Sequence, residues 1–252
     1  MVFPIGDDNS DRATTPIVNY VLIALNVLVF VFLQGMGSND KFTYAYATVP
    51  QEIVTGVDIA RPVTVNDPVS GDPVGRIPLQ PTPLSVYLTL LTSMFMHGGF
   101  AHLFGNMLYL WIFGDNLEDR LGHVRYLVFY LACGVLASLA HVVTNTGSYI
   151  PSLGASGAIS GVLGGYILLY PKRKVRAIVL RGFMTEIPAW AAIGLWFVFQ
   201  LISGLGMLGR GSQEGGVAYA AHIGGFIAGL ALIKIFAIGR NTSAAPPALG
   251  RG

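Results

Sequence analysis

Six apolar segments dominate the sequence, and each has about the length of a helix that crosses a lipid bilayer. Such a helix needs about 20 mostly apolar residues. The segments lie at roughly 17–34, 100–117, 124–144, 156–170, 187–208 and 217–238. Only 11% of the 252 residues are charged, whereas about 25% is usual in soluble domains. The sequence therefore predicts an all-α membrane protein with six spanning helices.

The segments between and around these helices predict the domain organisation. A long stretch at about 35–96 contains several prolines and acidic residues, which predicts an extramembrane first loop rather than a span. Residues 1–16 form a short polar N-terminus, and residues 241–252 are expected to be a disordered tail. The six-helix domain is accordingly expected at 17–240.

Lys and Arg residues near the helix ends predict the orientation, because cytoplasmic loops carry an excess of them. Arg120 and Arg125 follow the second apolar segment, a cluster at 172–181 follows the fourth, and Arg240 follows the sixth. Both termini are therefore expected in the cytoplasm. The N-terminus has the features of neither a cleaved signal peptide nor a transit peptide, which favours the plasma membrane of a prokaryote.

Four polar residues inside the apolar segments are candidates for function, because a polar side chain is costly in hydrocarbon. They are His102 and Asn106 in the second segment, Ser156 at the start of the fourth, and His222 in the sixth. Segments two, four and six run in the same direction under this topology. All four side chains are therefore expected at similar depth, near the outer face of the membrane.

Small residues predict that the fourth and sixth segments pack together. Gly157 and Gly161 are four residues apart, as are Gly225 and Gly229. Such small faces let two helix backbones approach closely. Ser156 adjoins the small-residue face of the fourth segment, and His222 lies on that of the sixth. Packing of the two faces would therefore bring the His222 imidazole to the Ser156 hydroxyl.

A serine hydroxyl becomes a nucleophile when a neighbouring base takes its proton, and histidine has a suitable pKa. No Asp or Glu is expected to be available to orient His222, because Asp115, Glu118 and Asp119 lie at the inner end of the second segment, Glu186 in an inner loop and Glu214 in an outer loop. This predicts a Ser–His dyad rather than a triad. His102, Asn106 and the backbone N–H of Ser156 are the candidate donors to an oxyanion.

Three motifs in this order resemble those of the rhomboid proteases. Residues 154–157 (GASG) resemble the GxSG motif, residues 102–106 (HLFGN) the HxxxN motif, and residues 221–229 (AHIGGFIAG) the AHxxGxxxG motif. The resemblance implies a six-helix rhomboid bundle that acts as an intramembrane serine endopeptidase. It also implies Ser156 and His222 as the catalytic dyad, and substrates that are transmembrane helices with small or helix-weakening residues near the cut.

The sequence departs from the family at two places. Leu88 and Thr89 stand where many relatives have a Trp-Arg pair, which leaves the anchoring of the first loop open. Ser160 stands where an aromatic residue stacks on the catalytic histidine in some relatives. What orients His222 is therefore also left open, with the Ser160 hydroxyl or a water near the ring as one possibility.

Other classes of membrane protein fit the sequence less well. A zinc protease would need a motif such as His-Glu-x-x-His, and an aspartic protease would need carboxylates within its helices. A transporter would show repeated halves with broken helices. No metal, cofactor or nucleic-acid partner is expected, and the partners are the bilayer and transmembrane substrates. The main alternative is an inactive rhomboid-like protein that binds or escorts membrane clients.

Overall fold

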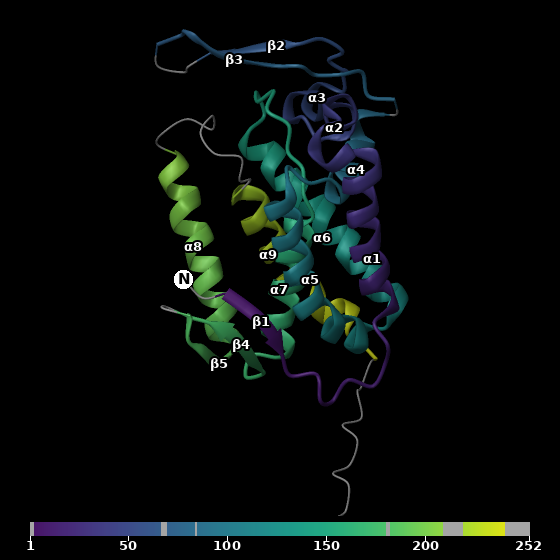
Figure 1. The fold of residues 1–252 in the computed structure, drawn as a ribbon, viewed down its shortest axis with the longest axis vertical. Helices are drawn as coiled ribbons and strands as arrows, with labels where there is room; N and C mark the ends of the chain where they lie inside the picture. Colours follow the sequence, from purple (N-terminus) through teal and green to yellow (C-terminus); the bar gives the residue numbers. More distant parts are fainter. Residues whose placement is uncertain (1–2, 67–69, 84, 180–181, 209–218, 240–252) are drawn as a thin grey trace, which may run out of the picture.

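The computed structural model describes residues 3–66, 70–83, 85–179, 182–208 and 219–239. A helix lies at each of the six apolar segments (Figure 1). These helices are α1 (Ile17–Leu28) with its π-helical continuation η1 (Val29–Leu33), α5 (Phe100–Leu121), α6 (His123–Thr144), α7 (Ser156–Leu169), α8 (Ala189–Leu208) and α9 (Tyr219–Phe236). The helix ends differ most from the predicted ones at α5, which was predicted to end at about residue 117 and continues to Leu121. The expected disordered tail at 241–252 lies outside the described residues.

The segment between η1 and α5 contains short elements. They are η2 (Gly35–Gly37), α2 (Asp40–Tyr46), α3 (Pro50–Thr55), β2 (Val63–Asn66), β3 (Pro73–Ile77), η3 (Val86–Leu88), α4 (Thr89–Thr92) and η4 (Ser93–Phe95). The hairpin of β2 and β3 lies beyond one end of the bundle (Figure 1). The last part of the segment packs against the helices, because Met94 belongs to the main core and its sulfur lies against Gly134 of α6.

The prediction of an all-α protein is wrong in one respect, because the described residues include two small antiparallel sheets. Strands β1 (Phe3–Asp7), β4 (Lys174–Ile178) and β5 (Met184–Pro188) form one sheet in the order β1-β4-β5, and β2 pairs with β3. Val175 and Ala177 are buried while their neighbours Lys174 and Arg176 are exposed. This period of two is the strand signal, and the basic cluster at 172–181 concealed it.

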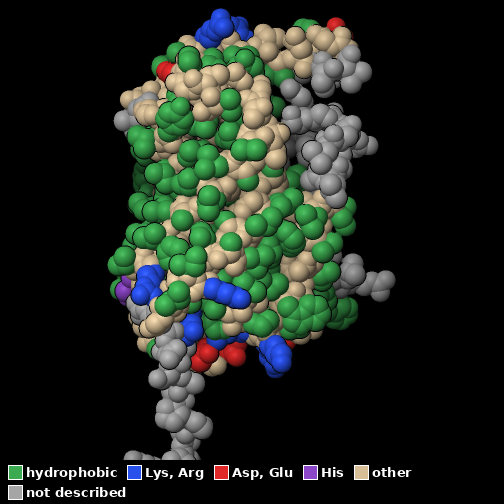
Figure 2. All heavy atoms as spheres, turned by 180° about the vertical axis from the view of Figure 1, so that it is seen from behind, with side chains coloured by type: hydrophobic (Ala, Val, Ile, Leu, Met, Phe, Trp, Pro, Cys, Tyr) green, Lys and Arg blue, Asp and Glu red, His purple; other side chains and the backbone are tan. Residues whose placement is uncertain are grey.

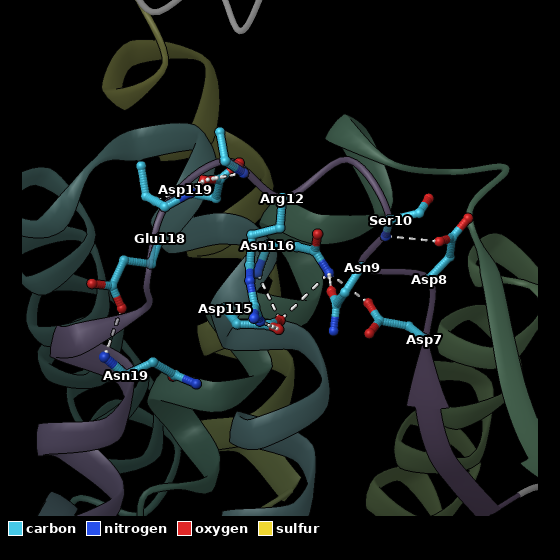
Figure 3. A network of polar contacts seen from close by, with 12 residues as sticks. Asp7, Asp8, Asn9, Ser10, Arg12, Asn19, Asp115, Asn116, Glu118 and Asp119 are labelled. Carbon is cyan, nitrogen blue, oxygen red and sulfur yellow. Dashed lines mark hydrogen bonds and ion pairs between the residues drawn. The ribbon is translucent and has the colours of Figure 1, made fainter. Parts of the chain in front are cut away.

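The three-stranded sheet joins the N-terminus to the end of α5 through a polar network (Figure 3). Asp7 Oδ2 accepts hydrogen bonds from Tyr166 Oη at 2.6 Å and from Asn116 Nδ2 at 2.7 Å. Arg12 forms an ion pair of 2.7 Å with Asp115. These contacts fix the segment before α1 to the bundle although more than 100 residues separate the partners in sequence.

Glu118, at the end of α5, caps the start of α1. Its carboxylate accepts the backbone N–H groups of Val18 at 2.9 Å and Asn19 at 2.7 Å. The first N–H groups of a helix have no partner within the helix, so a buried helix end needs acceptors of this kind. The fully buried carboxylate therefore replaces the water that an exposed helix end would bind.

The flank of the bundle is apolar. Figure 2 shows hydrophobic side chains over the middle of this face, with the charged side chains towards its two ends. Trp111, Leu195, Phe199 and Ile227 are among the exposed large hydrophobic residues. By length and composition, α6 and α9 are long and apolar enough to cross a membrane, and shorter apolar helices lie at Ile17–Leu33, Val86–Phe95, Ser156–Leu169 and Ala189–Ser203.

The buried Asp7 predicts a pH dependence of stability. Burial raises the pKa of Asp7 from 3.8 to about 7, and the nearby Asp115 carboxylate acts in the same direction. Tyr166, Asn116 and Arg173 act against this increase. The folded protein then holds a proton that the unfolded chain releases, so the free energy of unfolding should fall as the pH rises from about 4 to about 7. Asp7→Asn should flatten this dependence and raise the unfolding temperature at pH 8 by about 2–4 °C.

The measurement is thermal unfolding in detergent at pH 5, 6, 7 and 8, with Asp8→Asn as the control. Asp8 is exposed, and its hydrogen bonds with Ser10 lower its pKa. Its replacement should leave the profile between pH 5 and 8 unchanged. Equal destabilisation by Asp7→Asn at every pH would show that Asp7 is already ionised throughout this range.

Candidate active site

Ser156 is the first residue of α7, and the loop before it is held in place by the segment that precedes α5. Thr48 and Ser152 form a two-way backbone bridge, with N–O distances of 3.0 and 2.8 Å. The N–H of Gly154 donates to the carbonyl of Ser93 at 2.9 Å. Gly154 has a φ of +125°, which disfavours a side chain. The loop therefore presents Ser156 in a fixed position at a helix N-terminus.

The segment before α5 is itself anchored by polar side chains. The Thr48 hydroxyl donates to the carbonyl of Thr89 at 2.8 Å and lies 2.9 Å from the Ser93 hydroxyl. The Gln34 side chain bonds both the N–H and the carbonyl of His97, at 2.8 and 3.0 Å. These contacts anchor the first loop to the rest of the structure, although the Trp-Arg pair of many relatives is absent.

Ser156 and His222 are in direct contact, since His222 Nε2 lies 2.7 Å from Ser156 Oγ. The contact joins α7 to α9 where glycines bring the two backbones together. A Cβ built on Gly225 would lie 2.1 Å from the carbonyl oxygen of Gly157, and one on Gly229 would lie 2.0 Å from that of Gly161. Any side chain at either α9 position would force the helices apart and separate the imidazole from the hydroxyl.

The second ring nitrogen of His222 contacts a residue that the sequence analysis missed. Gln200 of α8 places its Oε1 atom 2.8 Å from His222 Nδ1. Only carboxylates were considered as the residue that orients His222. Gln200 is also a polar residue inside an apolar segment, so the criterion that selected Ser156 and His222 could have selected it. Trp196 and Tyr219 lie beside the imidazole, with ring-centroid distances of 6.1 and 6.3 Å.

Ser160 does not orient His222 through its hydroxyl. That hydroxyl donates to the carbonyl of Ser156 at 2.6 Å, one turn earlier in α7. A buried serine in a helix commonly bonds the preceding turn in this way. The hydrogen bond from the Ser160 hydroxyl therefore goes to the backbone of α7, and the side-chain contact of His222 Nδ1 among the described residues is with Gln200.

His102 lies beside the loop that carries the nucleophile. Its Nδ1 accepts the N–H of Gly98 at 3.3 Å, so the proton of the neutral ring is placed on Nε2. A Cβ built on Gly154 would lie 2.9 Å from both Cε1 and Nε2 of His102, and 3.6 Å from Ser156 Oγ. The Nε2–H of His102 is therefore directed at the loop that carries Ser156.

Asn106 lies one helical turn after His102 on α5. It is buried, and its Nδ2 has no hydrogen-bond partner among the described residues. Leaving such a donor unpaired costs about 1–3 kcal/mol. The backbone N–H of Ser156 also lacks an acceptor within its own helix, because the residue stands at the N-terminus. Within the described residues, the Nε2–H of His102, the Nδ2–H of Asn106 and the backbone N–H of Ser156 thus have no hydrogen-bond acceptor.

This arrangement contains the parts that acyl transfer requires. A hydroxyl contacts an imidazole nitrogen, the other nitrogen contacts an amide, and donors lie beside the hydroxyl. In the comparison with known proteins, a family model of the Rhomboid domain matches residues 85–238, well over half of the chain. The chain belongs to the rhomboid family, and this confirms the resemblance found in the sequence.

The curated relatives include bacterial and mitochondrial proteins. "Rhomboid protease GluP" of Bacillus subtilis is 30% identical over 216 residues, which cover 85% of this chain and 34% of that protein. "Rhomboid protein 1, mitochondrial" of Saccharomyces cerevisiae is 32% identical over 156 residues, which cover 60% of this chain and 42% of the relative. "Presenilin-associated rhomboid-like protein, mitochondrial" of Homo sapiens is 36% identical over 96 residues, which cover 37% of this chain and 25% of that protein.

The matched regions span less than half the length of each of these relatives. What the comparisons establish for this chain is a mostly helical membrane protein of the rhomboid family.

The glycine contact predicts a specific sensitivity to substitution. Gly229→Ala places a methyl group against the backbone of α7, so the helices must separate. We expect the free energy of unfolding to fall by about 1–3 kcal/mol, as in other overpacked cores. Thermal unfolding in detergent measures the change.

Gly194→Ala is the matched control, because a Cβ on this glycine of α8 would meet nothing within 4 Å. It should leave stability unchanged or raise it by up to about 1 kcal/mol, since alanine favours helix. Equal unfolding temperatures for the two variants would contradict the close approach of α7 and α9.

Proposed function

We propose that this protein is an intramembrane serine endopeptidase that hydrolyses peptide bonds in or near transmembrane helices of other membrane proteins. The observation that carries the proposal is the 2.7 Å contact between Ser156 Oγ and His222 Nε2 at a glycine-lined helix crossing. Serine and histidine far apart in sequence meet here in the geometry that nucleophilic catalysis needs. The name of the bacterial relative, a rhomboid protease, is consistent with this activity.

The chemical steps follow from the positions of the side chains. His222 Nε2 takes the proton of Ser156 as its oxygen attacks the substrate carbonyl, and the same proton passes to the leaving amine. The resulting acyl-enzyme is hydrolysed by water that His222 activates in turn. No group beyond these residues and water is needed to balance the reaction.

Donors beside the nucleophile stabilise the negative charge that forms on the carbonyl oxygen. In this proposal they are the Nε2–H of His102, the Nδ2–H of Asn106 and the backbone N–H of Ser156. The buried Nδ2 of Asn106 supports this role, because none of the described residues accepts a hydrogen bond from it and the donor is therefore available to an oxyanion.

The proposal includes a placement in the membrane. Six helices within 17–240 span the bilayer, both termini face the cytoplasm, and the long first loop and the site face the outer side. The apolar flank of the bundle and the Lys and Arg residues at 172–181 support this orientation. We place the protein in a prokaryotic plasma membrane; relatives named as mitochondrial make an organellar membrane the alternative.

Substitution of the dyad tests the activity. Ser156→Ala and His222→Ala should each abolish cleavage of a model transmembrane substrate by the purified protein in detergent. Ser138→Ala is the control, because this half-buried serine lies on α6 and has no part in the proposed chemistry. Cleavage by the Ser156→Ala variant would place the nucleophile elsewhere. A folded wild type that binds transmembrane substrates without cutting any would favour the inactive, client-binding alternative.

Asn106→Leu separates a catalytic role from a structural one. Loss of an oxyanion donor typically lowers kcat by about 10²–10³-fold, and we expect KM to change little. Because Nδ2 of Asn106 is buried and bonds to none of the residues that the structure describes, its removal should not lower the unfolding temperature. Steady-state kinetics and thermal unfolding measure both effects. An unchanged kcat, or a kcat that falls only together with stability, would contradict the role.

A further inference from the structure

Catalysis by a Ser–His pair requires one particular form of the imidazole. A neutral ring carries a single proton, on either Nδ1 or Nε2. The nitrogen that faces the serine must have a free lone pair to accept the hydroxyl proton. Since Nε2 of His222 faces Ser156, its proton must lie on Nδ1. A ring with the opposite arrangement would donate to Ser156 and could not activate it.

Gln200 supplies the acceptor that this form needs. Its Oε1 lies 2.8 Å from His222 Nδ1, and an amide oxygen can only accept a hydrogen bond. The Gln200 side chain is 7% exposed, so water does not compete strongly for it. Both contacts of His222 therefore fit the tautomer with the proton on Nδ1, because Nδ1–H donates to Gln200 and Nε2 accepts from Ser156.

Packing between α8 and α9 holds Gln200 at this position. The rings of Phe197 and Phe226 stack with centroids 4.2 Å apart and an interplanar angle of 21°. Phe197 lies three residues before Gln200, and Phe226 lies four residues after His222, so each aromatic ring shares a helix face with one partner of the hydrogen bond. The same face of α8 thus provides both the packing and the acceptor.

An amide also suits this environment better than a carboxylate. Within an apolar bundle, a buried charge is costly unless it is paired and hydrogen-bonded. Gln200 can orient the ring without adding a charge to the site. The amide takes the place that an aspartate occupies in a catalytic triad, where it orients the histidine and fixes its tautomer.

We propose that Gln200 is the positioning residue of the dyad: it holds His222 in the tautomer with the proton on Nδ1 and so keeps Nε2 ready to accept the proton of Ser156. The inference rests on the proposed function for its kinetic consequence. The tautomer itself is a property of the resting protein and can be measured without a substrate.

The test compares two replacements of similar size. Gln200→Met keeps the volume but removes the strong acceptor, whereas Gln200→Glu keeps an oxygen that can accept from Nδ1. Ile202→Leu is the control on α8, because Ile202 is exposed. Two quantities are measured for each full-length variant in detergent: kcat and KM on a model transmembrane substrate, and the 15N NMR signals of the imidazoles, with His222 assigned from the His222→Ala variant.

For Gln200→Met we expect kcat to fall by about tenfold, the effect of losing one hydrogen bond of about 1.4 kcal/mol, with KM unchanged. The His222 signals should change from a ring protonated at Nδ1 to a mixture of both tautomers. Gln200→Glu should retain most of the wild-type kcat, and the control should match wild type in both measurements.

The proposal is overturned if Gln200→Met leaves the tautomer and kcat unchanged. It is equally overturned if both replacements at this position lower kcat and unfolding temperature by the same amount, since the role would then be packing alone. If wild type cuts no substrate but its His222 tautomer depends on Gln200, the positioning role stands and the proposed protease activity fails.

Discussion

The contact between the backbones of α7 and α9 is the constraint on which the candidate site depends. Carbonyl oxygens of Gly157 and Gly161 lie where side chains on Gly225 and Gly229 would otherwise project. This approach brings Ser156 of one helix to His222 of the other. In lipid the hydrophobic effect contributes little to helix association, so close backbone packing becomes a main source of attraction. The close packing of α7 and α9 thus both stabilises the helix bundle and places Ser156 against His222.

Polar groups at the two ends of the bundle are organised differently. At the N-terminal end of α1, carboxylates are paired with N–H groups and with Arg12, so that the charges are largely compensated (Figure 3). At the candidate site, by contrast, the Nδ2 donor of Asn106 has no hydrogen-bond partner within the described part of the chain. Polar groups that are hydrogen-bonded or ion-paired stabilise a fold. A buried donor without such a contact can instead donate to a reacting group.

Much of the helical fold could be predicted from the sequence, because the length and composition of an apolar segment are local properties. The residues in contact at the site were also among those chosen, since Ser156 and His222 are polar interruptions flanked by glycines. The pairing of β1 with β4 was missed because it joins segments some 170 residues apart, and the alternation of buried and exposed residues in β4 was concealed by the basic cluster at 172–181. The β2–β3 hairpin was missed because its proline-containing stretch was predicted to be a loop. Gln200 was missed because a carboxylate was sought, although a neutral amide performs the same orienting contact.

The position of the two reacting groups is set by backbone atoms, and this has a consequence for how the protein can change over evolution. Side chains around the site that hold neither the Ser156 loop nor the helix crossing can vary without altering the distance between α7 and α9. For the proposed protease activity, selectivity for different sequences can then be acquired by such substitutions while Ser156 and His222 stay in contact. The glycine positions are the opposite case, because a side chain at Gly225 or Gly229 would push α7 and α9 apart and so separate Ser156 from His222.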